Sequence, residues 1–190
     1  MPNLSPTQLS DVILLCIATP MDGRPGEPGC LWGLTPNVMG DPGVAKSAIN
    51  KKLCCDIASV PINEFLATLF ASQHPPEDFS GALIPDGMGG AKQICPLGPV
   101  RKILSKGTGV IFLDEINGAP PATQAALQSF IHERRAGDEV MPGEIRIIAA
   151  SNPEDIATGG HRLAPAVANR MVHIEYMGYA TGLDRLEYGG

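Results

Sequence analysis

The stretch that decides the fold is Gly40-Asp41-Pro42-Gly43-Val44-Ala45-Lys46-Ser47. It differs only at Ala45 from the pattern G-x-x-x-x-G-K-[ST], whose backbone N–H groups surround a phosphate, whose lysine reaches the β/γ-phosphates and whose hydroxyl ligates Mg²⁺. By itself the stretch also fits a turn followed by a helix cap. Gly43 supplies the glycine that a positive φ in mid-loop requires. We expect Ala45 at the entry to the next helix, with helical φ and ψ.

The segments around this loop predict helices that alternate with apolar strands. Ser5, Pro6 and Gln8 form the pattern of a capped helix start, and glycine after Lys106 marks a helix stop. The predicted helices cover residues 6–18, 46–57, 100–105 and 121–132, and the predicted strands cover 110–113, 145–150 and 172–176.

Three segments are harder to interpret. The strand that feeds the loop covers 37–39 or starts near 30–32, and Pro36 weakens a longer strand. Residues 65–72 fit either a buried strand or the end of a helix, which periodicity cannot separate in a short apolar run. Residues 75–99 are rich in glycine and proline and are expected to form a long connection, a kind of segment that is usually functional or disordered.

Apolar strands alternating with helices predict a parallel sheet covered on both faces. Such sheets bind ligands at the carboxyl ends of their strands. Polar side chains follow the predicted strands at three places, Lys46-Ser47, Asp114-Glu115 and Asn152. We therefore expect them to lie together on one rim of the sheet.

The residue types at this rim suit phosphate chemistry. Asp114 would hold Mg²⁺ together with Ser47, and Glu115 would polarise the water that attacks a γ-phosphate. Asn152 would orient that water or touch the γ-phosphate, and Arg170 would stabilise charge in the transition state. Each residue also has a plain interpretation: solvated acids after a strand, a turn residue before proline and a surface arginine.

Composition narrows the class of protein. The chain has 190 residues, of which 44% are hydrophobic and 18% charged, as in a globular domain. A net charge of −6 without a long basic run argues against nucleic acid as a partner. The longest early apolar run, 12–18, is too short to span a membrane. Five cysteines without a C-x-x-C pair argue against a disulfide framework or a zinc site and favour a reducing, cytoplasmic setting.

The order and spacing of these motifs resemble those of AAA+ ATPases. More narrowly, the chain resembles the MoxR and dynein-related branch, which tolerates alanine before the loop lysine. The run Asp114-Glu115-Ile116-Asn117-Gly118-Ala119-Pro120-Pro121-Ala122-Thr123-Gln124-Ala125-Ala126-Leu127 is the most specific part of the resemblance. The segments 149–153 and 163–170 match it too, and the likeness covers residues 34–176.

The resemblance implies a P-loop NTPase αβα sandwich with a five-stranded parallel sheet and an Mg-ATP site formed by residues 40–47. It also implies that Asn152 is the sensor-1 residue and that Arg170 is an arginine finger acting on a neighbouring subunit in a ring, usually a hexamer. Residues 79–93 correspond to pore-facing loops or a helical insertion in relatives, and we expect them to contact a protein client. Relatives often work with a von Willebrand A-type partner.

The expected organisation is an ATPase core at 34–176, preceded by a helix and loop at 1–33 within the same domain. Residues 177–190 would begin a truncated C-terminal region, because only 14 residues follow Tyr176 and relatives carry a helical lid there. The leading hypothesis is an ATPase that remodels or activates a protein partner. The alternatives are a nucleotide-binding assembly module with little or no turnover, and an α/β domain with vestigial motifs.

Overall fold

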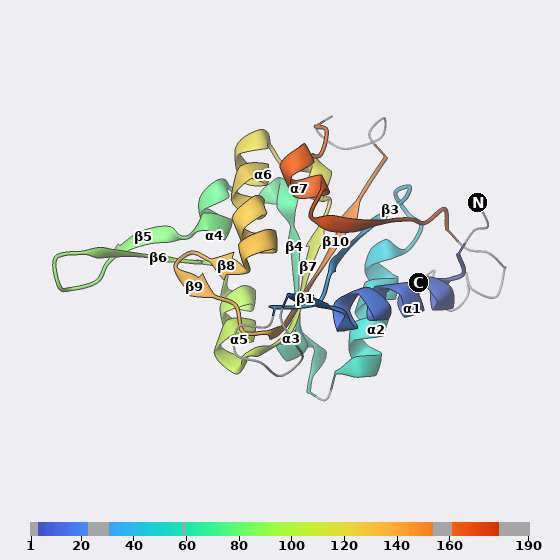
Figure 1. Ribbon diagram of the computed structural model, residues 1–190, viewed down its shortest axis with the longest axis horizontal. Helices are drawn as coiled ribbons and strands as arrows, with labels where there is room; N and C mark the ends of the chain where they lie inside the picture. Colours follow the sequence, from blue (N-terminus) through green and yellow to red (C-terminus); the bar gives the residue numbers. More distant parts are fainter. Residues whose placement is uncertain (1–3, 23–30, 59, 154–160, 179–190) are drawn as a thin grey trace.

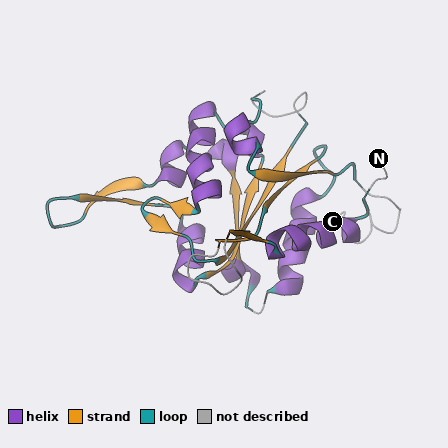
Figure 2. Cartoon of the chain, viewed as in Figure 1, coloured by secondary structure: helices purple, strands orange, loops and turns teal. Residues whose placement is uncertain are grey.

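A five-stranded parallel sheet in the order β11-β3-β10-β7-β4 forms the centre of the molecule (Figure 1). The computed structural model describes residues 4–22, 31–58, 60–153 and 161–178. Helices flank the sheet on both faces (Figure 2), which confirms the predicted α/β fold. The strands are β3 (Thr35–Met39), β4 (Leu66–Phe70), β7 (Thr108–Asp114), β10 (Glu144–Ser151) and β11 (Met171–Glu175).

Alternate side chains of the central strands enter two separate hydrophobic cores. In β7, Val110 and Phe112 belong to one core, while Ile111 and Leu113 belong to the other. This alternation explains the continuous apolar run, because a strand covered on both faces needs apolar residues at every position. The first core is completed by α1 (Pro6–Ala18) and α2 (Lys46–Ile57), and the second by α4 (Pro76–Ser80), α5 (Gly98–Lys106) and α6 (Pro121–Gln128).

Local capping chemistry sets several element boundaries where the sequence predicted them. The Ser5 hydroxyl accepts a hydrogen bond from the Gln8 backbone N–H at 3.2 Å, and the Gln8 side chain accepts one from the Ser5 N–H at 2.9 Å, so α1 begins at Pro6. Helix α2 has its predicted bounds, and Gly107 ends α5 in the left-handed conformation. Residues 65–72 contain strand β4. Strand β3 includes Pro36, but the strand pairs with β10 only from the next residue, Asn37, onward.

Short elements connect these layers. The helix predicted at 121–132 is α6 followed by a π-helical turn. Within the described part of the chain, no helix has the length and hydropathy needed to cross a membrane. The short elements are β1 (Pro20–Asp22), β2 (Leu31–Trp32), α3 (Ile62–Phe65), η1 (Ala71–Gln73), η2 (Ile116–Gly118), the π-helix η3 (Ser129–Glu133), β8 (Arg135–Ala136), β9 (Glu139–Val140) and α7 (Pro165–Ala168).

The segment 75–99 is not the irregular connection that its composition suggested. It contains α4 and an antiparallel hairpin, residues 82–94, formed by β5 (Ala82–Pro85) and β6 (Ala91–Ile94). We call this hairpin the arm, and it projects from the body of the molecule (Figure 1). The Asp86 carboxylate closes the tip by accepting hydrogen bonds from the N–H groups of Met88 and Gly90. The glycines at the tip therefore allow a tight turn between two paired strands. The arm itself is a hairpin and not a helical insertion.

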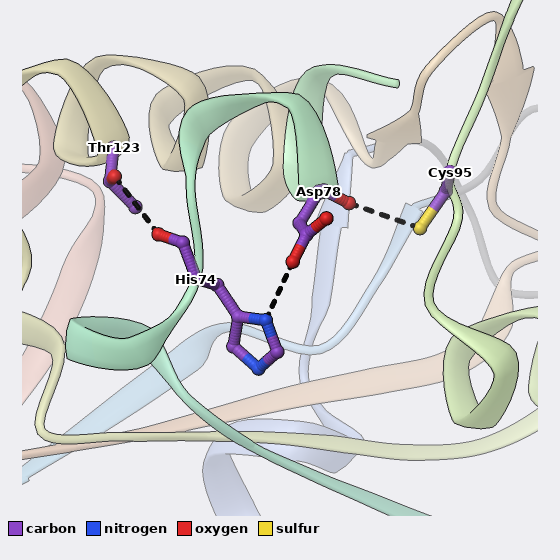
Figure 3. A network of polar contacts seen from close by, with 4 residues as sticks. All are labelled: His74, Asp78, Cys95 and Thr123. Atoms are coloured by element: carbon purple, nitrogen blue, oxygen red, sulfur yellow. Dashed lines mark hydrogen bonds and ion pairs between the residues drawn. The ribbon is translucent and has the colours of Figure 1, made fainter. Parts of the chain in front are cut away.

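Polar contacts attach the base of the arm to the body (Figure 3). His74 Nδ1 lies 2.7 Å from Asp78 Oδ2, and the Cys95 thiol donates to the Asp78 carbonyl at 3.2 Å. The Thr123 hydroxyl of α6 donates to the His74 carbonyl at 3.1 Å. Because these residues come from three separate segments, the network connects α4, the end of β6 and α6.

Candidate functional site

The loop 40–47 leaves the carboxyl end of β3 and leads into α2. Gly43 has φ +83° in open space, so its glycine is needed for conformation alone. Gly40 is needed for space, because a Cβ there would collide with the Tyr176 carbonyl. Ala45 lies at the entry to α2, as expected, but the expected helical φ and ψ were wrong: it is the N-cap residue, outside the first helical turn, and its φ of 62° and ψ of 26° are left-handed. An alanine here carries strain of about 1–2 kcal/mol.

The Lys46 ammonium is buried and has three oxygen partners. It donates to the carbonyls of Gly40 at 2.6 Å and Asp41 at 3.0 Å, and to Asn152 Oδ1 at 3.0 Å. Burial lowers the pKa of Lys46 from its ordinary value, and the nearby carboxylates of Asp114, Asp41 and Glu115 oppose that shift. Since an ammonium has three protons, all of its donors are used. A phosphate oxygen must therefore displace one partner, and the Asn152 side chain is the one that can rotate away.

Ser47 and Asp114 meet across the site. The Ser47 hydroxyl donates to Asp114 Oδ2 at 2.5 Å, although the two residues are 67 positions apart in the chain. Asp114 Oδ1 accepts a hydrogen bond from the Glu115 N–H at 3.0 Å, which orients the carboxylate at the end of β7. A hydroxyl and a carboxylate directed at one point form an oxygen donor set of the kind that Mg²⁺ prefers. These residues fit the predicted metal role.

Glu115 has a left-handed backbone, with φ 52° and ψ 41°. Its Oε2 accepts a hydrogen bond from the Ser72 hydroxyl at 3.2 Å. Sequence reasoning missed Ser72, and the only available signal was its position as the last residue of the segment 65–72, which fitted either a strand or the end of a helix. Left-handed backbone at a non-glycine residue is uncommon and is often found at functional sites.

Asn152 follows β10, and its backbone is held by the side chain of Asn117. Asn117 Nδ2 donates to the Asn152 carbonyl at 2.8 Å, and Asn117 Oδ1 accepts from the Asn152 N–H at 3.2 Å. Sequence reasoning assigned no role to Asn117, although it lies in the motif run. Its two bonds leave the Asn152 side chain directed at Lys46.

A cavity of about 230 Å³ collects these groups at the carboxyl ends of β3, β7 and β10. The arrangement can bind an anion beside a metal ion and hold a carboxylate near both. Arg170 is not part of the lining; it follows α7 and its Nη1 donates to the Ala166 carbonyl at 2.6 Å. The lining residues are Pro42, Gly43, Ala45, Lys46, Ser47, Ala48, Asp114, Glu115 and Asn152.

Comparisons with known proteins place the chain in a family and show its fold. The model of the AAA domain, dynein-related subfamily, matches residues 38–171. No curated protein matches the chain. Among solved structures, Hsp104 with ATPγS and FITC-casein matches at a TM-score of 0.55 and 16% identity, over 75% of this chain and 29% of that one. This likeness shows a shared fold.

A second solved structure is that of a Cytophaga hutchinsonii protein provisionally named an ATPase, with 23% identity and a TM-score of 0.49. The match covers 81% of this chain and 44% of that one, so the chain spans less than half the length of either protein. The family model covers the phosphate loop, the acid pair and Asn152 within one continuous match to well over half of the sequence. The chain therefore belongs to the AAA family, in its dynein-related subfamily.

Proposed function

We propose that the chain binds Mg-ATP at this rim and hydrolyses it within a ring of identical subunits, driving the remodelling or activation of a protein partner. One observation carries the proposal. Lys46 and Ser47 at the start of α2, Asp114 and Glu115 at the end of β7, and Asn152 after β10 line one cavity. Because the same residues would be needed to bind phosphates, metal and water, their convergence supports a site for Mg-ATP rather than a structural role.

The chemistry divides among these residues. The backbone N–H groups of residues 40–47 and the Lys46 ammonium would bind the β- and γ-phosphates. Ser47 and Asp114 would hold Mg²⁺, which when bound neutralises phosphate charge. Glu115 would accept a proton from the attacking water. Asn152 would exchange its contact with Lys46 for one with the γ-phosphate or the water. A phosphate anion near Lys46 would also offset the burial that lowers the pKa of this amine.

Arg170 would act on the nucleotide of a neighbouring subunit. Its position outside the cavity of its own chain supports this assignment, since an arginine that serves its own nucleotide would be expected to line that cavity. The ring, with six members as the likeness to AAA+ proteins suggests, follows from this role. We assign the ATPase core to residues 34–176 and place α1 in the same domain, because Leu9 and Ile13 of α1 pack in the core that contains α2.

The arm is our candidate for contact with a protein client or a von Willebrand A-type partner. Leu83 is 71% exposed and Met88 94% exposed, and Ile84 is exposed beside them. The only charged side chain at the tip, Asp86, is turned into the hairpin, where it accepts two backbone N–H groups. An apolar, weakly charged tip suits a polypeptide rather than a nucleic acid. Free thiols at Cys16, Cys54, Cys55 and Cys95 fit a reducing compartment such as the cytoplasm.

The test of hydrolysis is the substitution Glu115→Gln. It keeps the size of the side chain but removes the base, so phosphate release should fall about 10²–10⁴-fold while nucleotide binding persists. Unchanged turnover would remove Glu115 from the mechanism. Binding of Mg-ATP by the wild-type chain without any phosphate release would instead favour the nucleotide-dependent assembly module.

The test of the ring uses mixtures. Subunits carrying Arg170→Ala have an intact nucleotide site, and subunits carrying Glu115→Gln supply an intact arginine. Mixed rings should therefore regain phosphate release at interfaces that combine the two. No recovery at any mixing ratio would contradict the action of Arg170 on a neighbour.

A further inference from the structure

Three buried polar side chains of the run 114–127 each bind the backbone of a different distant segment. Asn117, Thr123 and Gln124 are 3%, 1% and 1% exposed. Asn117 binds residue 152, Thr123 binds residue 74, and Gln124 binds residues 162 and 164. Two of these segments carry or lead to proposed site residues, Asn152 and Arg170, and the segment at residue 74 does not.

Gln124 is the most completely bonded of the three. Its Nε2 donates to the Ala119 carbonyl at 3.0 Å and to the Arg162 carbonyl at 3.3 Å, and its Oε1 accepts from the Ala164 N–H at 2.6 Å. Carbonyls only accept and N–H groups only donate, so these partners fix the orientation of the amide. A substitution that removes the amide takes this partner from three backbone groups, of which the Ala119 carbonyl is in a buried bond and the other two are in part-buried bonds.

The segment held by Gln124 leads directly to Arg170. The N–H groups of Val167 and Ala168 both donate to the Ala164 carbonyl at 2.9 Å, and that of Asn169 donates to the Pro165 carbonyl at 3.0 Å. Arg170 continues this turn, because its N–H donates to the Val167 carbonyl and its guanidinium to that of Ala166. A displacement at residues 162–164 would therefore be transmitted to Arg170.

Asn117 contacts the segment after β10 instead. Its two bonds fix both backbone polar groups of Asn152, whose side chain contacts Lys46. Asn117 therefore supports the nucleotide site of its own subunit, whereas Gln124 supports an arginine that serves the next one.

We propose that Asn117 and Gln124 are positioning residues with separate tasks: Asn117 places Asn152 in the subunit's own site, and Gln124 places Arg170 for the neighbouring site. This division of tasks rests on the proposed function, because it requires a ring in which Arg170 acts between subunits. A displacement of about 1 Å in such groups costs on the order of 10²-fold in rate.

The test uses shape-conserving variants of the full chain. Asn117→Leu and Gln124→Met remove the side-chain amides and keep the side-chain volumes. Thr123→Val, next to Gln124 in α6, is the control, because the hydrogen bond of Thr123 reaches neither Asn152 nor residues 162–164. If the apolar variants do not fold, Asn117→Asp and Gln124→Glu replace them, since each keeps an acceptor for one backbone N–H. The readouts are phosphate release from mixed rings and hydrogen exchange of the backbone N–H groups.

Two complementation groups are expected. Rings that mix Gln124→Met with Glu115→Gln should regain phosphate release, and rings that mix Gln124→Met with Arg170→Ala should not. Rings that mix Asn117→Leu with Arg170→Ala should regain phosphate release, and rings that mix Asn117→Leu with Glu115→Gln should not. Exchange should rise at Ala164 in Gln124→Met and at Asn152 in Asn117→Leu, and at neither in Thr123→Val.

The outcomes separate the two proposals. If Glu115→Gln and Arg170→Ala subunits recover together but Gln124→Met is rescued by neither or by both, the positioning inference is overturned and the ring stands. If Glu115→Gln and Arg170→Ala subunits never recover together, the action of Arg170 on a neighbouring subunit is contradicted, and the proposed division of tasks is contradicted with it. Unchanged exchange at Ala164 in Gln124→Met would overturn the structural step by itself.

Discussion

The two ends of the central sheet both hold a buried cation, but in different surroundings. At the carboxyl end, Lys46 binds two loop carbonyls and the Asn152 side chain and lines a cavity. At the amino end, Arg134 donates to the Gly33 carbonyl at 2.6 Å and lies 3.5 Å from the Thr35 hydroxyl. A neighbouring arginine, Arg146, donates to the Ile17 carbonyl at the end of α1.

Lys46 and Arg134 show what separates a functional buried charge from a structural one. Burial lowers the pKa of both side chains, that of Arg134 to about 10, with a contribution from the nearby Arg146. Burial alone therefore does not identify the site. The surroundings do, because Lys46 lines a cavity and binds the side chain of Asn152, whereas Arg134 binds the Gly33 carbonyl just before β3 and does not line that cavity. A positive φ does not separate the two ends either, since Ala45 and Glu115 have it at the carboxyl end and Arg134 has φ 54° at the amino end.

The largest expected effect is on stability at the amino end. Arg134→Ala leaves the buried Gly33 carbonyl without this donor and opens a cavity, so the free energy of unfolding should fall by about 2–4 kcal/mol. Nucleotide affinity, measured by calorimetric titration below the unfolding transition, should not change. The exposed Arg101 is a matched control, and Arg101→Ala should stay within about 0.5 kcal/mol. Lost nucleotide affinity in a folded Arg134→Ala chain would contradict the structural role assigned to Arg134.

A metal-dependent effect is expected at the carboxyl end. Asp114→Asn weakens one oxygen ligand while keeping its shape, so ATP affinity in Mg²⁺ should fall about tenfold, or about 1.4 kcal/mol. In EDTA, the variant and the wild-type chain should bind ATP equally. The check is a pair of titrations, and an equal loss of affinity in both buffers would mean that Asp114 does not act through the metal.

The smallest effect tests the strain in the loop. Ala45→Gly removes the left-handed alanine, and after the entropy cost of glycine the free energy of unfolding should rise by about 0.5–1 kcal/mol. Gly43→Ala should lower the free energy of unfolding, because Gly43 has φ +83°, which alanine rarely adopts. No heavy atom lies within 4 Å of the position of a Cβ, so this effect would come from the backbone alone. Both are measured by denaturant unfolding. A destabilised Ala45→Gly chain would mean that the loop does not hold this residue in a strained conformation.

Sequence reasoning predicted the elements that local chemistry determines. The capping box at Ser5 set the start of α1, and the apolar run before Asp114 identified β7. The convergence of Lys46, Asp114 and Asn152 followed from the rule that parallel strands end on one edge. The left-handed φ of Ala45 could not be predicted, because alanine rarely adopts it and the constraint comes from the whole loop.

The contacts that hold the site together were also beyond the sequence. Asn117 and Gln124 bind backbone groups 35 to 40 positions away, and backbone groups leave no pattern in residue types. The arm was missed because glycine and proline composition does not separate a hairpin from a loop. Its closing contact, from Asp86 to the tip, is visible only in three dimensions.

The decisive measurement for the nucleotide site compares the stabilisation that Mg-ATP gives to the wild-type chain and to Lys46→Ala. At a nucleotide concentration one hundred times the wild-type Kd, the wild-type free energy of unfolding should rise by about 2.7 kcal/mol. Lys46→Ala should gain no more than about 0.4 kcal/mol at the same concentration, which corresponds to a hundredfold or greater loss of affinity. An equal gain in both chains, or none in the wild-type chain, would contradict the assignment of this rim as the nucleotide site.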